Sequence, residues 1–318
     1  MEILRYTLYR LAGGIPLVLG VTLISFVLMV YFGPDKTFEL LGKNPTPEQI
    51  AEVRAELGYD RPFWIRYADY LREMATLDFG YSDSTGERVT SILARTVPVS
   101  LALLAPGFVL GNLLGIVLGL VAAWHRGGRI DKAIMAFAVI GMSISFLVVI
   151  IAFQVIFGVV LGWFPARGWD VHGPLSYLYH VTVPTLASVF VALGYNTRFF
   201  RAVLVEEMDR DHVRTMRAFG AGPATVLWQG VLMNAMIPII TRVMFSIPLI
   251  VISGSLLIES YFGIPGVGKV TYDAITSGDQ PILKAVVGLT AVLFVVILTV
   301  NDILYKVFDP RVGLGPQR

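Results

Sequence analysis

Six long apolar stretches limit what this chain can fold into. The hydrocarbon core of a bilayer is about 30 Å thick, so a helix needs about 20 apolar residues to cross it. Stretches of that length lie at 12–32, 98–124, 133–164, 181–200, 232–258 and 285–305. Hydrophobic residues make up 55% of the chain and charged residues only 15%, which argues against a cytosolic enzyme. The sequence therefore predicts an all-α integral membrane protein with six transmembrane helices.

The third stretch, 133–164, is too long for one straight span, so it is either two passes or one kinked or tilted helix. The charges of the loops favour one pass. With six passes, thirteen lysines and arginines fall on the side of the two termini, and three fall in the short loops of the other side. Basic residues concentrate on the cytoplasmic side of membrane proteins. Both termini are therefore predicted to be cytoplasmic, in a multi-pass protein of the bacterial inner membrane.

The predicted spans divide the chain into four parts. Residues 1–32 form the cytoplasmic start and the first span, and 33–97 form an extracytoplasmic helical segment. Residues 98–305 form a five-helix core, and 306–318 form a cytoplasmic tail. The capping pattern Thr46-Pro-Glu-Gln49 predicts a helix that stops near Gly58, and a second helix is expected from Pro62. This segment either packs over the outer mouth or docks an external partner.

Small and polar residues inside the spans are the candidates for helix packing and for a pathway. Four glycines recur every four residues, which predicts close approach of a helix from this chain or from another. They are Gly107, Gly111, Gly115 and Gly119. Candidate pathway residues are Asn112, Ser143, Ser145, Asn196, Arg242 and Ser246. Two interpretations of Arg242 are equally well supported. Its side chain either extends to the membrane interface or lines a water-filled pathway.

Several kinds of chemistry find no support in the sequence. The chain has no cysteine, and its four histidines lack metal-ligand spacing. The run Gly263 to Lys269 has the spacing of a phosphate-binding loop, but Val270 stands where that loop needs Ser or Thr. No catalytic residue or bound cofactor is therefore predicted. If the protein uses ATP, a separate subunit must hydrolyse it.

The predicted cytoplasmic loop 205–231 contains a short amphipathic helix. Val213, Met216 and Phe219 are expected on one face, with Arg214 and Arg217 on another, and Gly220 is expected to end the helix. From composition alone, this helix is either an interfacial anchor or a lever that another protein grips.

The pattern of this loop resembles the coupling-loop signature of ABC importer permeases. It reads Asp211-x-Val-Arg-Thr-x-Arg-Ala-x-Gly220, followed by Asn234-Ala235 and Pro238. The similarity is specific to the dipeptide/oligopeptide permease family and extends over nearly the whole chain. Further matching motifs are Thr46-Pro-Glu-Gln-Ile50, Asp78-Phe-Gly-Tyr-Ser82, Phe262-x-x-Pro-Gly-x-Gly268 and Asp309-Pro-Arg311.

This resemblance implies a type I ABC importer permease that forms half of a translocation pathway for peptides or a related small solute. The implied partners are a second permease chain, two cytoplasmic ATPase subunits that bind ATP and magnesium, and an external solute-binding protein. The implied contact with the ATPase is made by Asp211, Val213, Arg214, Thr215, Arg217, Ala218, Phe219 and Gly220.

Three other classes of protein were weighed against this one. A secondary transporter driven by an ion gradient would favour inverted repeats and a buried midplane acid, and the sequence has neither signal. Asp302, an acidic residue inside a predicted span, stands near the end of that span. A membrane enzyme would need a metal cluster or a nucleophile with its base, and a membrane scaffold would leave the coupling-loop pattern unexplained.

Overall fold

The computed structural model describes residues 2–33, 37, 41, 45–56 and 58–308. Helices make up almost all of this part, and its single β contact is an isolated antiparallel bridge between Tyr81 and Arg88. Helices suit a membrane because their backbone hydrogen bonds are satisfied within the segment. The all-α prediction is confirmed.

Five helical segments are long and apolar enough to cross a bilayer. They are Tyr9–Phe32 of α1 (Glu2–Phe32), α5 (Val89–Trp124), α8 (Pro174–Met208), the run Met236–Phe262 and Gln280–Tyr305 of α14 (Gln280–Phe308). The run Met236–Phe262 is continuous but consists of α11 (Met236–Leu249), η3 (Ile250–Gly254) and α12 (Ser255–Phe262). The second span begins at Val89 rather than at residue 98, because Pro98 lies inside its helix.

The third predicted stretch is a broken helix. α6 (Arg129–Ser143) and the pair α7 (Phe146–Phe153) and η1 (Gln154–Val160) meet at 95°. Each arm is about 22 Å long at 1.5 Å per residue, too short to cross a bilayer alone. Two full passes are therefore excluded, and the chain has six candidate spans when the bent pair counts as one.

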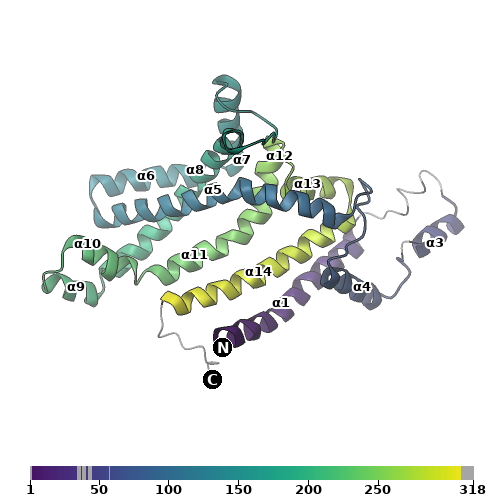
Figure 1. Ribbon diagram of the computed structural model, residues 1–318, viewed down its shortest axis with the longest axis horizontal. Coiled ribbons are helices and arrows are strands. Elements are labelled where there is room, and N and C mark those ends of the chain that lie inside the picture. Colours follow the sequence, from purple (N-terminus) through teal and green to yellow (C-terminus); the bar gives the residue numbers. More distant parts are fainter. Residues whose placement is uncertain (1, 34–36, 38–40, 42–44, 57, 309–318) are drawn as a thin grey trace.

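The helices form an elongated bundle with short elements at its two ends, and the segment that follows α7 projects from its side (Figure 1). α8 packs against α5 and α6, and α14 packs against α1 and α11. At one end lie α9 (Asp211–Ala218), α10 (Pro223–Thr225) and η2 (Val226–Leu232). At the opposite end lie α3 (Pro47–Glu56), α4 (Phe63–Thr76) and α13 (Val267–Ser277). We call these the α9 end and the α13 end.

The two expected helices between α1 and α5 are present. Thr46 and Gln49 form a reciprocal capping box, with the Thr46 amide donating to Gln49 Oε1 (3.0 Å) and the Gln49 amide donating to Thr46 Oγ1 (3.3 Å). α4 packs on the spans through Tyr67, whose hydroxyl donates to the Leu19 carbonyl, and Tyr70, whose hydroxyl donates to the Lys284 carbonyl. Burial, with help from Tyr67 and Glu73, raises the pKa of Tyr70 to about 12. Its hydroxyl therefore remains a donor.

Candidate functional site

α9 is a two-turn helix that lies across the end of α8. Asp211 stands in its first turn and Arg217 in its last, which places each charge where the helix dipole favours it. The Thr215 hydroxyl donates to the Asp211 carbonyl (2.9 Å). Gly220 has φ of +78°, in the left-handed region that glycine adopts without strain, and the helix ends just before it. The predicted stop at Gly220 is confirmed.

One side of α9 is packed into the protein. Val213 is fully buried in a cluster with Phe200 and Leu204 of α8 and with Val226 and Val231 of η2. These contacts fix α9 to the adjoining span and to the start of the next one. Movement of α9 would therefore be transmitted to both of these elements.

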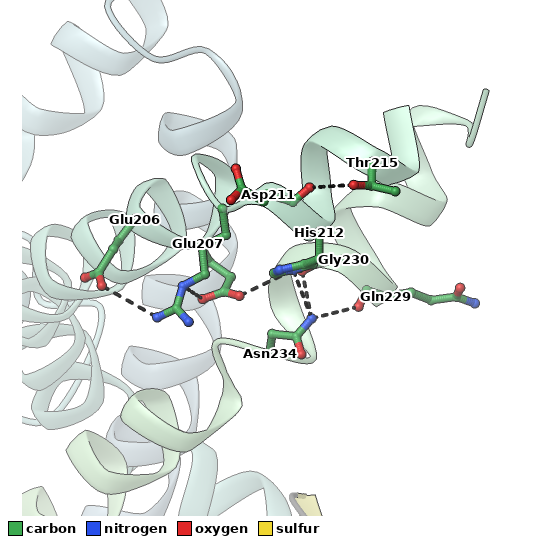
Figure 2. Close-up of polar contacts among 9 residues, drawn as sticks. Glu206, Glu207, Asp211, His212, Thr215, Gln229, Gly230 and Asn234 are labelled. Carbon is green, nitrogen blue, oxygen red and sulfur yellow. Dashed lines mark hydrogen bonds and ion pairs between the residues drawn. The ribbon is translucent and has the colours of Figure 1, made fainter. Parts of the chain in front are cut away.

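Gly230 allows η2 to approach α9 closely. A Cβ atom at Gly230 would lie only 2.9 Å from Met216 Sδ. The Gly230 carbonyl oxygen accepts a hydrogen bond from Asn234 Nδ2 (2.9 Å) and lies 2.8 Å from His212 Nε2 (Figure 2). Asn234 of the predicted signature also lies 3.4 Å from His212 through the same Nδ2 atom, so it connects η2 to α9 within the chain.

Ionised side chains surround the start of α9. The buried Glu207 carboxylate pairs with Arg210 Nε (3.0 Å) and lies 3.4 Å from His212 Nε2 (Figure 2). Nearby, Asp209 pairs with Arg126 (2.7 Å). These contacts join the end of α8 to α9 and to the α5–α6 connection. They leave the opposite side of α9 open.

That open side carries charged and aromatic groups. Asp211 and Arg214 are both exposed and are 3.5 Å apart at their nearest charged atoms. Thr215, Arg217 and Ala218 are exposed as well. Phe219, expected on the face of Val213 and Met216, is instead 87% exposed, so that prediction is wrong. The reason is that Val213 and Phe219 are six residues apart, which at about 100° per residue places them roughly 120° apart around the helix.

A paired Asp131 and Arg201, which sequence reasoning missed, brace the same end. Arg201 Nε and Nη2 donate to the Asp131 carboxylate, at 2.5 and 2.6 Å, and the Gly127 amide donates to it at 2.8 Å. Bidentate arginine–carboxylate pairs are geometrically specific. The sequence offered no unique signal for this pair, because α6 also holds Arg129 and Lys132 and α8 also holds Arg198.

The glycine stripe faces α8 of the same chain, which settles the choice of partner that the sequence left open. A Cβ atom at Gly107, Gly111 or Gly115 would lie 2.8–2.9 Å from a side chain of α8, and one at Gly119 would lie 3.0 Å from its backbone. Asn112 and Asn196 are buried in this contact, where Asn196 Nδ2 donates to Asn112 Oδ1 (3.1 Å). This pairing favours a packing role for the two asparagines.

Comparison with known proteins now decides the family. The model of the binding-protein-dependent transport system inner membrane component matches residues 115–314, and the model of its N-terminal region matches 3–104. The chain belongs to this family. The protein is thus the transmembrane permease subunit of an ABC importer and a multi-pass inner membrane protein. An ion-gradient-driven transporter is not supported.

The permease is similar to curated proteins along its full length. It is 33% identical to a putative peptide transport system permease protein of Brucella abortus, over 96% of this chain and 98% of that protein. It is 32% identical to a dipeptide transport system permease protein of Bacillus subtilis, over 98% of each chain. A chain of the inward-facing MetNI methionine ABC transporter matches its fold with a TM-score of 0.56 and 20% identity, over 69% of this chain and 96% of that one.

The remaining pathway candidates of the permease lie at two places. Ser143 and Ser145 are exposed where α6 and α7 are broken, and the Ser143 hydroxyl donates to the Val139 carbonyl. Ser246 donates to the Val243 carbonyl. The Arg242 guanidinium lies 5.6 Å from the centre of the Phe199 ring, and within the described residues its buried Nε has no hydrogen-bond partner.

The run from Gly263 to Lys269, which has the spacing of a phosphate-binding loop, contacts a carboxyl group of the same chain. Glu259 of α12 is fully buried and accepts hydrogen bonds from Ser100 Oγ (2.6 Å) and the Lys269 amide (3.0 Å). Ser100 Oγ in turn accepts from the Val267 amide (2.8 Å). The N-terminus of α13 is therefore occupied by a carboxyl group of the same chain, so the phosphate-loop spacing here leaves no room for a nucleotide phosphate.

A second buried carboxylate, Asp279, joins the segment before α5 to the start of α14. It accepts from the hydroxyls of Ser82 (2.6 Å) and Ser84 (2.7 Å) and from the Ser84 amide (3.1 Å). Burial alone would raise the pKa of Asp279, but these hydrogen bonds outweigh it and lower that pKa below its ordinary value. In the described part of the chain, no three His, Asp or Glu side chains gather as a metal site.

Proposed function

We propose that this permease forms half of the translocation pathway of an ATP-driven importer of peptides, di- or oligopeptides, or a related small solute. The substrate class rests on the relatives, several of which are named as peptide or dipeptide transport permeases. The proposed assembly contains a second permease chain, two ATPase subunits that bind ATP and magnesium, and an external solute-binding protein. Both termini and α9 are proposed to face the cytoplasm, in accordance with the loop charges.

The observation that carries the coupling role is the two-sided character of α9. Val213 anchors one side in the protein, while Phe219 and the charged groups of Asp211 and Arg214 project from the other. An exposed aromatic beside charges that lack strong internal partners is typical of an interface. In the proposed mechanism, closure of the ATPase subunits on ATP moves α9, and α8 and η2 transmit this motion to the pathway.

Arg242 is proposed to line the pathway, with Ser246 on the same helix and with Ser143 and Ser145 at the α6–α7 break. A guanidinium in a water-filled cavity keeps its charge at lower cost than one in hydrocarbon. It also suits the carboxylate of a peptide, which it can bind with two hydrogen bonds. The stacking of Arg242 on Phe199 supports a fixed position for this group.

The first experiment purifies the tagged permease gently from membranes and identifies the co-purifying chains by mass spectrometry. We expect a second permease and ATPase subunits. The recovered complex is then placed in proteoliposomes with its binding protein, and uptake of a labelled dipeptide and a labelled oligopeptide is measured with and without ATP. A complex that binds and hydrolyses ATP but imports neither peptide would contradict the proposed substrate class.

The coupling role is tested at Gly220 and Phe219. Gly220→Asp and Gly220→Asn place similar side chains in the same left-handed conformation, but only the first adds a charge. We expect Gly220→Asp to abolish uptake with normal membrane insertion and Gly220→Asn to keep part of it. Phe219→Ala should reduce recovery of the ATPase, whereas Trp64→Ala at the α13 end should not. Normal uptake by Gly220→Asp together with full ATPase recovery by Phe219→Ala would disprove the role.

A further inference from the structure

A pocket of about 340 Å³ lies where the end of α1 meets α3 and α4. Its size is at the lower end of the range for small-molecule sites. Three arginines and three aromatic residues dominate its lining, and none of the described residues that line it is acidic. They are Arg54, Arg61, Arg66, Tyr31, Tyr59 and Phe63.

The pocket carries an uncompensated positive charge. Arg66 stacks on the rings of Tyr59 (5.1 Å) and Phe26 (5.9 Å), and among the described residues no carboxylate pairs with Arg54 or Arg66. Arg61 has only an exposed contact of 3.5 Å with Asp69. The C-terminus of α1 supplies about half a negative charge, too little to balance three guanidinium groups.

The arginines of the pocket do not simply reflect the composition of the segment that surrounds it. Segment 33–97 holds eleven acidic and eight basic residues, yet within the described part of this segment three arginines and no acidic residue line the pocket. Guanidinium groups match phosphate and carboxylate oxygens with paired hydrogen bonds. The pocket therefore suits an anionic group.

The position of the pocket favours a lipid over a soluble anion. Only 11% of the apolar window of α1 is buried, so this helix exposes a long apolar face. Leu28, Tyr31 and Phe32 continue this exposed face up to the pocket, and the exposed Trp64 of α4 stands beside its lining residue Phe63. Aromatic side chains of this kind gather where hydrocarbon meets the headgroup region. A phospholipid bound there would cover the apolar face with its acyl chains, which a soluble anion cannot do.

We propose that this pocket binds the phosphate group of an anionic phospholipid, whose acyl chains lie along the exposed face of α1. Arg54 and Arg66 hold the phosphate, and the ring of Tyr59 keeps the Arg66 guanidinium in place. The site lies at the end of the bundle opposite to α9 (Figure 1) and does not depend on which solute is transported.

The test uses the purified transporter complex, stripped of lipid and titrated with short-chain phosphatidylglycerol, short-chain phosphatidylcholine or inorganic phosphate. Native mass spectrometry reports the bound probe. We expect the unmodified complex to bind phosphatidylglycerol more tightly than phosphatidylcholine. The double variant Arg54→Gln/Arg66→Gln should weaken phosphatidylglycerol binding about tenfold, as loss of charge-assisted hydrogen bonds implies.

Two further variants separate charge from folding. Arg72 is an exposed arginine of α4, the helix that carries Arg66, and it does not line the pocket. Arg72→Gln should therefore leave phosphatidylglycerol binding unchanged. Arg66→Lys keeps the charge but loses the paired hydrogen bonds and the stacking, so it should bind phosphatidylglycerol more tightly than Arg66→Gln and less tightly than the unmodified complex. Equal phosphatidylglycerol binding by the double variant and the unmodified complex would overturn the proposal. So would binding of inorganic phosphate or a free dipeptide in the pocket with the affinity of phosphatidylglycerol, because either result would mean a site for soluble anions.

Discussion

The two ends of this permease use charged residues in opposite ways. At the α13 end, Glu259 and Asp279 are buried and accept hydrogen bonds from separate elements of the same chain. At the α9 end, Asp211 and Arg214 are exposed and share only a long ion pair. Burial makes the two carboxylates of the α13 end costly to disturb. Exposure to solvent means that the ion pair of the α9 end contributes little to stability. The first end is suited to hold the chain together and the second to contact a partner.

The α9 end itself combines both kinds of residue. Its base is fixed by buried Val213 and by the bidentate contact of Arg201 with Asp131. Only the outer surface of α9 is left without strong internal contacts. A coupling element needs both a fixed base and an exposed outer surface, because a helix that moves independently of the spans transmits no motion to them.

The largest effect on stability is expected at Gly268. A Cβ atom there would lie 2.3 Å from the carbonyl carbon of Ser255 and 2.4 Å from the Leu256 amide nitrogen. Gly268→Ala must therefore separate α12 from α13, and we expect the free energy of unfolding to fall by about 3 kcal/mol. Thermal unfolding of the purified protein, followed by tryptophan fluorescence, measures this. Gly20→Ala, with nothing within 4 Å, is the control. Equal melting temperatures for both variants would contradict the close contact.

Asp279→Asn should cost about 2 kcal/mol at neutral pH, because the neutral amide loses the charge assistance of the hydrogen bonds from the two serines and cannot also accept from the Ile282 amide. The pKa of Asp279 is lowered in the folded state from its ordinary 3.8. Its stabilisation is therefore fully present above pH 3.8 and is lost as the pH falls below that value through the folded pKa. Melting temperatures of protein and variant between pH 7 and pH 3 should converge only at the acid end.

The matched control for this prediction is Asp273→Asn. Asp273 is exposed and pairs with Lys269 on the same helix, so its loss should change stability by less than about 0.5 kcal/mol. If Asp273→Asn destabilised the protein as much as Asp279→Asn, burial would not be what distinguishes the two carboxylates.

Val213→Ala tests the anchored base of α9. Removing two buried carbon atoms should cost about 1.5 kcal/mol. Because α9 is a short helix at one end of the bundle, we expect the lost stability to appear as local opening. Hydrogen exchange over residues 211–220 should become faster, with little change in melting temperature. Arg217→Gln on the exposed side should leave exchange unchanged. Unchanged exchange in Val213→Ala would mean that α9 is held mainly by its polar contacts.

The smallest effect on stability, below about 0.5 kcal/mol, is expected for Arg214→Glu. Its effect on uptake should nevertheless be large, because the reversed charge faces the proposed ATPase. The double variant Asp211→Arg/Arg214→Glu restores an ion pair within α9 but presents both charges in reversed order. We expect uptake to stay low in it. Recovery of uptake would assign these residues to internal pairing and remove them from the partner contact.

Local features of the fold could be read from the sequence. The capping box at Thr46 and Gln49 and the helix stop at Gly220 each depend on a few neighbouring residues. The break between α6 and α7 was anticipated only as one of two choices, since apolar length reveals an overlong stretch but not a 95° bend. Phe219 lies on the exposed side of α9 instead of beside Val213, because six helical residues separate the two side chains by roughly 120°.

The sequence by itself determined where the long apolar stretches lie, the close-approach stripe on α5 and the short amphipathic helix in the loop 205–231. These follow from residue type and spacing along one element. Only the tertiary structure decided that α8 meets the stripe, that Glu259 occupies the N-terminus of α13, and that Asp279 holds the serines before α5. Ser100 and Glu259 are 159 residues apart, and Ser82 and Asp279 are 197 apart. Such pairs form when packed helices bring them together, and no local pattern specifies which helices will pack.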